Sequence, residues 1–300
     1  MDTPGIKNHF PVNIRTARPE DTPQVMELTS HIWEGHDYVP YVWDEWLHDG
    51  KGPLLVAEYE QRVVGLVKLT QVTLLDWWMQ GLRVDPTFEG HGIASQLHDY
   101  VLAYWQQHGA GSLRLTTHSQ RFPVHHLCER TGFIRVDEYT YYIAASIPEA
   151  TGAFTPVQKD ETFIAYQAAL QNPLGALTNF VMDMGWLFLA PDQQKIEDLT
   201  LAGRAEWWHD RQGLLFWWED DDEDDAGNKI YTPTVSLIAC VPGTLAEMLG
   251  DFRHLAARRG YNRAGWVAPM RAEVITALVQ AGFTREWDGS VYLYEKRQVE

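Results

Sequence analysis

The sequence predicts an α/β protein built from two domains, and three observations lead to this prediction. The chain has 300 residues, about twice the size of a common domain. Short runs with the alternation of strands are interleaved with runs at helical spacing. The pair Gly132–Phe133, which follows a helical run, recurs 150 residues later as Gly282–Phe283. The chain therefore reads as an internal duplication.

The first half contains strands and helices in a regular order. Helix starts are indicated at Thr22–Pro23, a cap followed by proline in the first turn, and after a glycine turn near residue 90. The helix after that turn carries an apolar stripe at a spacing of four, made by Ile93, Leu97, Val101 and Trp105. A further helix is predicted at 124–131 and closes at Gly132. Strands are predicted at 12–15, 54–58, 63–70, 77–84, 112–117, 133–136 and 140–144.

The second half repeats this order with lower fidelity. Central strands are predicted at 214–218 and 234–240, the long helix at 245–257, and the final helix at 274–281. The linker is placed at 145–156. An acidic run at 219–225 separates the two central strands, either as a loop for a divalent cation or cationic partner, or as a solvated hairpin tip. It lacks the ligand spacing of a calcium loop, so the solvated tip is favoured.

Composition excludes several classes of protein. The formal net charge is −17, which disfavours nucleic acid and favours cationic partners. No apolar run is long enough to span a membrane, and no signal peptide is indicated. The two cysteines, Cys128 and Cys240, make no disulfide framework. A soluble cytoplasmic protein is expected.

The segment from Leu82 to Ser95 is the most informative part of the sequence. A strand ends there, Gly90 and Gly92 follow, and a helix begins. Backbone N–H groups at such a turn converge with the positive end of the helix dipole, and glycine lets an anion approach closely. The turn is therefore a candidate phosphate site. Neither the dinucleotide-binding motif nor the P-loop motif fits it.

Two motifs in this context resemble the GNAT superfamily of acyl-CoA N-acyltransferases. The first reads Glu89-Gly90-His91-Gly92-Ile93-Ala94, against Arg/Gln-x-x-Gly-x-Gly/Ala in the family. The second reads Leu127-Cys128-Glu129-Arg130-Thr131-Gly132-Phe133, against Leu-Tyr-Glu-x-x-Gly-Phe. The resemblance covers residues 12–143 well and the second half faintly.

The resemblance implies tandem domains, each a twisted mixed sheet flanked by helices, with parallel central strands that part to admit acetyl-CoA or another acyl-CoA. An acyltransferase domain is expected at 1–145, and a degenerate domain without a phosphate-binding turn at 155–300. No metal is expected. The implied residues that bind the co-substrate are Leu82, Arg83, Val84, Glu89, Gly90, His91, Gly92, Ile93, Ala94, Ser95 and Arg121.

Three residues depart from the family pattern. Glu89 places a negative charge where the family prefers Arg or Gln, which disfavours a diphosphate. Arg121 replaces a frequent Asn, and its guanidinium could contact a CoA phosphate. Cys128 replaces a Tyr that often protonates the departing thiolate. Either the Cys128 thiol supplies this proton, or Cys128 is a small buried apolar residue, which is favoured. Tyr139, Tyr141 and Tyr142 are further candidates for the acid.

An amine acceptor also needs a base, because an amine with a pKa of about 10.4 is almost fully protonated at pH 7. The implied strand offers Trp78 and Gln80, expected on one face with Leu82. Gln80 could orient a water that relays the proton to Asp76 or His118. Gln80, His118 and Cys128 are therefore the catalytic candidates. Of His125 and His126, one is expected to face the cleft and the other solvent.

The leading interpretation is an N-acyltransferase that moves an acetyl group to a small-molecule or protein amine, with a cationic acceptor favoured by the acidic surface. One alternative is a non-catalytic protein that binds acyl-CoA, and another is transfer to a hydroxyl or thiol. The second half has no Gly-x-Gly at 239–246, and Val279 stands at the position of Cys128, so no CoA is expected there.

Overall fold

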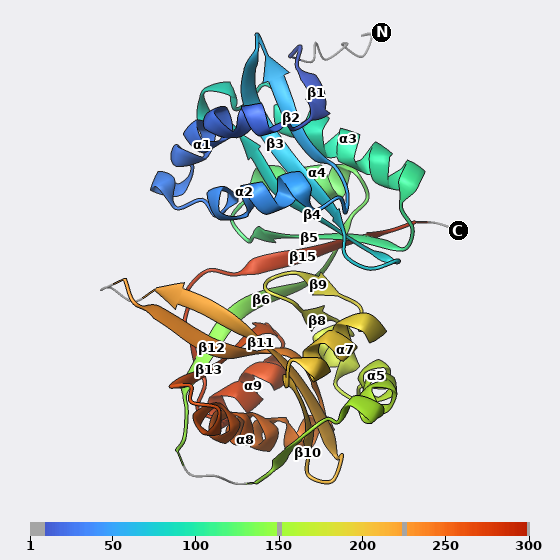
Figure 1. Ribbon diagram of the computed structural model, residues 1–300, viewed down its shortest axis with the longest axis vertical. Helices are drawn as coiled ribbons and strands as arrows, with labels where there is room; N and C mark the ends of the chain where they lie inside the picture. The colour runs from blue at the N-terminus through green and yellow to red at the C-terminus, as the bar shows by residue number, and fades with distance from the viewer. Residues whose placement is uncertain (1–9, 149–151, 224–226, 299–300) are drawn as a thin grey trace. The chain divides into compact units, whose positions relative to one another are not determined.

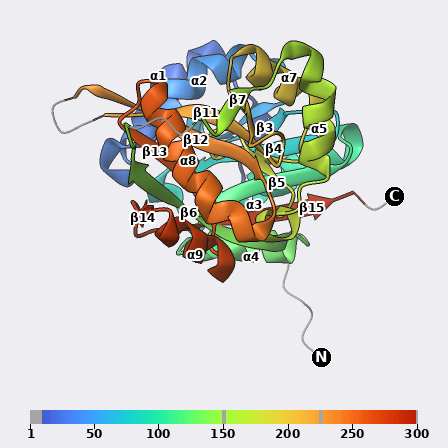
Figure 2. The same ribbon diagram turned by 90° about the horizontal axis from the view of Figure 1, so that it is seen from below.

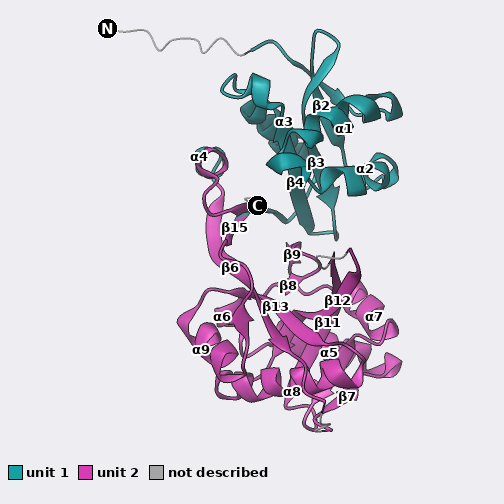
Figure 3. Cartoon of the chain, turned by 90° about the vertical axis from the view of Figure 1, so that its left-hand side faces the viewer, with its two compact units in different colours: residues 1–115, 126–132, 295–300 teal, residues 116–125, 133–294 magenta. Residues whose placement is uncertain are grey.

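The computed structural model describes residues 10–148, 152–223 and 227–298, which form two compact units (Figure 3). Unit 1 comprises residues 1–115, 126–132 and 295–300, and unit 2 comprises residues 116–125 and 133–294. The predicted boundaries 1–145 and 155–300 differ from this division. Residues 116–125 and 133–145 pack with the second half, and the last residues of the chain return to the first. The equivalence of the two halves in sequence stays a prediction.

Elements from the first half of the chain are labelled in Figure 1. Their bounds are β1 (Asn13–Thr16), η1 (Pro19–Asp21), α1 (Thr22–Ser30), η2 (Trp33–Gly35), α2 (Val39–His48), β2 (Leu54–Tyr59), β3 (Arg62–Gln71), β4 (Asp76–Val84), η3 (Pro86–Phe88), α3 (Ile93–His108), β5 (Ser112–His118), α4 (Phe122–Arg130) and β6 (Ile134–Ala145). Helix α2 has no counterpart in the prediction. Strand β6 is one continuous strand where two short strands were expected, because it pairs with β13 without interruption from Tyr139 to Ala145.

The sheet of unit 1 has the order β1-β2-β3-β4-β5. All neighbouring pairs are antiparallel except β4 and β5, which are parallel. Helices α1 and α2 cover one face and α3 the other (Figure 3). Trp43 and Trp46 of α2 are buried against β2 and β3 on the first face. On the second face, Gly65 of β3 makes room for α3, because a Cβ there would lie only 3.1 Å from Leu97.

The remaining elements belong to the second half of the chain. Their bounds are β7 (Phe154–Pro156), η4 (Lys159–Glu161), α5 (Thr162–Leu170), α6 (Gly175–Thr178), β8 (Met182–Asp183), β9 (Phe188–Leu189), α7 (Gln193–Leu201), β10 (Ala205–Trp208), β11 (Gly213–Glu223), β12 (Lys229–Ala239), η5 (Pro242–Thr244), α8 (Leu245–Arg258), β13 (Arg263–Pro269), α9 (Ala272–Gln280), β14 (Thr284–Arg285) and β15 (Val291–Arg297).

The sheet of unit 2 has the order β6-β13-β12-β11-β10-β7. Its path β7-β10-β11-β12-β13 repeats the order β1-β2-β3-β4-β5 of unit 1, with a parallel pair again at β12 and β13. Helices α8 and α9 form one group and α5 and α7 another (Figure 2). The predicted class, a mixed α/β fold with two domains of the same plan, is confirmed.

The structure also bears on the predictions about membrane-spanning helices and about the acidic run at 219–225. Within the described ranges, no helix combines the length and apolarity that crossing a membrane requires. The acidic run forms the far end of the β11–β12 hairpin, whose pairing extends to Glu223 and Lys229. Asp221 there is ion-paired to Lys229 at 2.8 Å, as expected of a solvated tip. Asp224 and Asp225 lie outside the described residues, as do the N-terminal residues 1–9 and positions 149–151 of the linker.

A buried histidine connects α3 to the end of α4. His98 is 1% exposed, and its Nε2 lies 2.9 Å from the hydroxyl oxygen of Thr131. That hydroxyl donates to the carbonyl of Leu127 at 2.8 Å, so it accepts a hydrogen bond from His98. Burial lowers the pKa of His98 to about 4. The neutral imidazole is therefore the form that the folded protein holds.

This histidine predicts acid sensitivity. The unfolded chain protonates His98 near pH 6.5, whereas the folded protein keeps it neutral down to about pH 4. Lowering the pH through this window favours the unfolded state, by about 3 kcal/mol. Urea unfolding at pH 7 and pH 4.5 measures the loss. His98→Gln, which keeps an N–H donor, is expected to lose less stability than wild type, and equal losses in the two proteins would contradict the assignment.

Candidate active site

Strand β4 carries a β-bulge at Gly81 and Leu82. Lys68 of β3 opposes Gln80, and Leu66 opposes Arg83, so β4 has one extra residue in this interval. Gly81 has a φ of +66°, and a Cβ there would lie 2.7 Å from the ring of Trp46. The position therefore requires glycine, both for its backbone conformation and for space.

The bulge changes which side chains share a face of β4. Gln80 and Arg83 lie on the same face, because their partners Lys68 and Leu66 are two residues apart. Leu82 lies opposite Val67, the β3 residue between Leu66 and Lys68, and therefore lies on the other face of the sheet. The prediction that Gln80 and Leu82 share a face is therefore wrong, because the extra residue breaks the alternation of the strand. Gly81 within a strand pattern was the signal for a bulge.

The parallel pair β4 and β5 is joined at one end only. Its pairing runs from Asp76–Trp78 to Ser112–Arg114, and the following residues of β4 pair with β3. At the joined end, Arg114 is buried and ion-paired to Asp76, and its Nη2 also lies 2.5 Å from Glu295. Past Trp78, one edge of β4 is thus available over the stretch that contains the bulge, as the parted strands of the resemblance imply.

The turn that follows β4 is held open by its backbone. Asp85 accepts hydrogen bonds from the backbone N–H of Thr87 at 2.9 Å and from its hydroxyl at 2.7 Å, which fixes η3. Gly90 and Gly92 then adopt φ values of +78° and +75°, and no atom of the described residues lies within 4 Å of a Cβ built on either. Over the described residues, the backbone N–H groups of positions 90–95 have no hydrogen-bond acceptor. Six consecutive donors thus stand at the start of α3.

The described side chains near the turn do not fill the space beside Gly90 and Gly92. The Nδ1 of His91 lies 3.0 Å from the carbonyl oxygen of Glu89, and the His91 ring packs 4.8 Å from the ring of Phe10. Glu89 is exposed to solvent. Its charge opposes an anion through water rather than by direct contact, and screening weakens that effect. The turn therefore retains the features of an anion site.

Arg83 is committed elsewhere. Its Nε and Nη2 donate to the two carboxylate oxygens of Asp37, each at 2.9 Å. The guanidinium also lies 4.4 Å from the ring of Trp33 and 5.2 Å from that of Tyr38. Asp37 is 1% exposed, so this pair connects β4 to the segment before α2. A role of the Arg83 side chain in binding a co-substrate stays a prediction, and its contacts favour a structural role.

Of the catalytic candidates, Cys128 is fully buried in unit 1. Burial raises the pKa of its thiol to about 12. Proton transfer from such a thiol to a thiolate with a pKa of about 8.5 would be uphill by about 5 kcal/mol. This environment favours the alternative in which Cys128 is a small apolar residue of the core.

His118 and Arg121 belong to unit 2, so their predicted roles at the co-substrate stay predictions. The Nδ1 of His118 accepts a hydrogen bond from the backbone N–H of Gln120 at 3.1 Å, which leaves the proton on Nε2. His118 therefore has its basic nitrogen occupied. Asp76, the other predicted proton acceptor, is held by Arg114. Gln80 is partly buried on the face of β4 that α2 covers. Of the three catalytic candidates, Gln80 is the one whose predicted role these contacts do not oppose.

His125 is 7% exposed, whereas His126 is exposed, so His126 is the histidine that faces solvent. A place of His125 in the cleft stays a prediction. The Nε2 of His125 donates to the carbonyl of Ser119 at 3.1 Å, so Nδ1 accepts from the hydroxyl of Tyr294, also at 3.1 Å. Sequence reasoning missed Tyr294, because the two residues are 169 positions apart. The phenol of Tyr139 is buried and hydrogen-bonded to Asn179, and that of Tyr141 is partly buried and hydrogen-bonded to Thr234. Burial raises the pKa of each.

Unit 2 has a different turn at the corresponding place. Strand β12 leads through η5 directly to α8, with the single glycine Gly243. Gly243 does not have a positive φ, and the N–H of Thr244 is hydrogen-bonded to Val241. The two left-handed glycines and the row of donors seen in unit 1 have no equivalent in this described segment. The absence of a CoA site in the second half stays a prediction.

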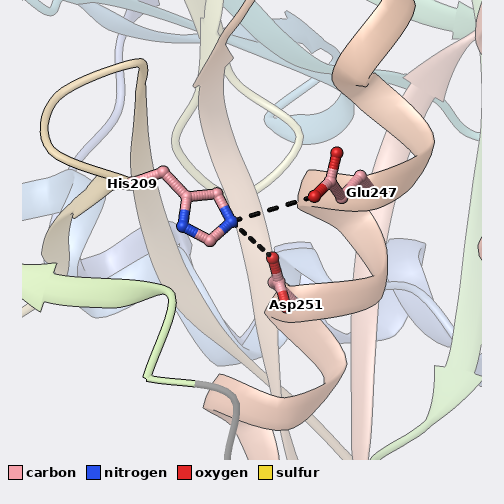
Figure 4. Close-up of side chains that lie close together, drawn as sticks. All are labelled: His209, Glu247 and Asp251. Carbon is pink, nitrogen blue, oxygen red and sulfur yellow. Dashed lines mark ion pairs between the residues drawn. The ribbon is translucent and has the colours of Figure 1, made fainter.

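Three side chains of unit 2 could hold a metal ion (Figure 4). The Nε2 of His209 lies 3.5 Å from Asp251 and 3.9 Å from Glu247, which are one turn apart on α8. Asp251 already accepts a hydrogen bond from the indole of Trp208 at 2.8 Å. These contacts describe an ion-pair cluster that connects the β10–β11 hairpin to α8.

Burial of both cysteines predicts low reactivity. Cys128 and Cys240 are at most 1% exposed, and burial raises the pKa of each thiol. A thiol reagent such as 5,5′-dithiobis(2-nitrobenzoate) is expected to react at pH 8 at least about 100-fold more slowly in the folded protein than in urea. Fast reaction of one thiol in the folded protein, located to Cys128 by mass spectrometry, would restore it as a proton donor.

Comparison with known proteins agrees with this geometry. Residues 22–133 match the model of the acetyltransferase (GNAT) family. A histidine N-acetyltransferase from Oreochromis niloticus is 31% identical over 85 residues, covering 27% of this chain and 24% of that protein. The human protein described as probable N-acetyltransferase 16 is 29% identical over 119 residues, covering 38% and 31% respectively. The matches thus span about a quarter to a third of the length of these relatives.

Solved structures extend the likeness of fold to nearly the whole chain. A GCN5-related N-acetyltransferase from Sphaerobacter thermophilus superposes with a TM-score of 0.61 at 14% identity, covering 98% of this chain and 96% of that one. A glucosamine N-acetyltransferase region of a fungal multi-domain enzyme superposes with a TM-score of 0.66 at 13% identity, covering 95% and 38%. At these identities the likeness concerns the fold alone.

Proposed function

Since residues 22–133 belong to the acetyltransferase (GNAT) family, we propose that this chain transfers an acetyl group from acetyl-CoA to an amine. The observation that carries the proposal is the row of N–H groups at positions 90–95, which have no acceptor among the described residues. The row begins with two left-handed glycines, and no described atom lies within 4 Å of a Cβ built on either. A diphosphate is the anion that such a row at a helix start suits. The acetyl-CoA chemistry of the family supplies one.

In this proposal, the parted edge of β4 holds the rest of the co-substrate. An extended pantetheine arm needs backbone hydrogen bonds, and β4 offers them beside Leu82 and Val84, past the last residue paired with β5. The joined end is closed by Arg114 and Asp76, so the arm enters from the end of β4 that leads to the glycine turn. The bulge at Gly81 lies where the thioester would reach.

The reaction requires a neutral amine that attacks the thioester carbonyl and a proton that leaves the amine. His118 and Asp76 are both occupied by hydrogen bonds or ion pairs, which favours transfer of the proton from the amine through a water at Gln80 to bulk solvent. Departure of a thiolate needs little help because its conjugate acid has a pKa of about 8.5. A buried Cys128 is therefore compatible with turnover.

The acceptor is proposed as a small amine. The net charge of −17 favours a cationic acceptor, and the names of two relatives, histidine N-acetyltransferases, make histidine the first compound to test. Glu89 and the buried Cys128 favour a second candidate function, binding of acetyl-CoA without transfer. The two functions differ in whether any amine is acetylated by the protein that binds acetyl-CoA.

Gly92→Trp tests the placement of the diphosphate. The indole would fill the empty space above the N–H groups, so acetyl-CoA affinity measured by calorimetry is expected to fall at least about 100-fold, together with turnover on an amine panel that includes histidine. Gly50→Trp is the matched control, because Gly50 is also exposed, left-handed and without neighbours within 4 Å. Wild-type affinity in Gly92→Trp would refute the placement. Binding by wild type without turnover would favour the second function.

A further inference from the structure

A cavity lies between the two parallel strands of unit 2. Strands β12 and β13 are paired at one position, Thr234 with Gly265, and separate beyond it. The cavity is open to solvent on one side and has room inside for about one or two water-sized groups. Its walls come from β12, β13, β6 and the segment from α6 to β9. The lining residues include Tyr139, Thr178, Asp183, Ser236, Trp266 and Val267.

Asp183 is the charged group of this wall, and it has no hydrogen-bond partner. The residue is 3% exposed, and neither carboxylate oxygen makes a hydrogen bond. The N–H groups of Gly185, Trp186 and the Trp218 indole approach it without reaching hydrogen-bond geometry. Burial raises its pKa well above the ordinary value. An unpaired buried carboxylate is costly, so Asp183 either stays protonated or needs a cation.

Charges around Asp183 favour a cation. Asp220 of β11 is close enough to raise its pKa further, and burial raises the pKa of Asp220 itself. On the side of β6, Asp137 is bound by Arg271 at 2.6 Å, and both groups act on the nearby phenol of Tyr139. Arg263 faces Asp220. No basic side chain among the described residues is ion-paired to Asp183, so the site repels anions.

Aromatic side chains line the same cavity. Tyr139, Phe188 and Trp266 lie in its wall together with Asp183. The ring centres of Tyr139 and Phe188 are 4.5 Å apart, at an interplanar angle of 41°. Aromatic rings attract a cation placed over their faces, so this lining is compatible with an ammonium group.

We propose that this cavity binds the ammonium group of a small organic amine, with Asp183 as its counter-ion. The bound cation stabilises the carboxylate form of Asp183, so binding of the amine is coupled to ionisation of this group. The site lies entirely in unit 2, and the proposal holds whether or not unit 1 transfers acetyl groups.

Three compounds of similar shape test the charge of the ligand. n-Butylamine, which is cationic at pH 7.5, is expected to bind in calorimetry, whereas n-butanol and butyrate are not. In two buffers of different ionisation enthalpy, the heat is expected to show release of up to one proton for each amine bound. Equal binding of n-butanol, or no binding of n-butylamine, would overturn the proposal.

Variants locate the site. Asp183→Asn keeps the shape of the side chain and is expected to lower the affinity for n-butylamine at least tenfold. Ser236→Val narrows the cavity, leaves Asp183 intact and is expected to have the same effect, which keeps the test valid if Asp183→Asn does not fold. Glu247→Gln, an exposed carboxylate of the same unit outside the cavity, is the matched control and should bind as wild type. Unchanged affinity in Asp183→Asn and Ser236→Val would refute the site.

Discussion

The separation of two parallel strands after a short paired stretch is the constraint on which the rest of unit 1 depends. Strands β4 and β5 are joined over three residue pairs, and the buried Arg114 holds Asp76 and Glu295 at that end. Beyond it, the bulge at Gly81 shifts β4 by one residue. An edge of backbone groups then leads directly to the glycine turn and the start of α3. A fully paired β4 would leave this edge inaccessible.

The same plan in unit 2 holds different chemistry. Strands β12 and β13 also part, but the turn that follows them lacks the two left-handed glycines. In unit 2 the space between the parted strands is lined by a buried carboxylate, Asp183. In unit 1 the parted strands lead instead to a row of backbone N–H donors. Backbone donors suit an anion and an unpaired carboxylate suits a cation. The two proposed sites, built on one fold, therefore differ in the charge that they prefer, in accord with the rule that function lies in the site rather than the fold.

Local signals in the sequence predicted the glycine turn and most strands of the first half, because turns and strand periodicity depend on neighbouring residues. The features that the sequence did not predict depend on contacts between residues far apart in the chain. Arg83 could not be assigned from its strand alone, since Asp37 lies 46 positions away. The division into units could not be read either, because the last residues of the chain pack beside β5, where Gln298 bonds Gly109 and Gly111. Asp183 gave no signal, since an isolated aspartate is usually exposed.

The central claim is that the N–H groups of positions 90–95 hold the diphosphate of acetyl-CoA. Amide resonances of protein labelled with ¹⁵N-glycine report on Gly90 and Gly92 directly. Titration with acetyl-CoA is expected to shift both resonances strongly, whereas S-acetylpantetheine, which has no diphosphate, should leave them in place while shifting Gly81 in the bulge. Equal shifts of Gly90 and Gly92 with the two compounds, or none with either, would contradict the account.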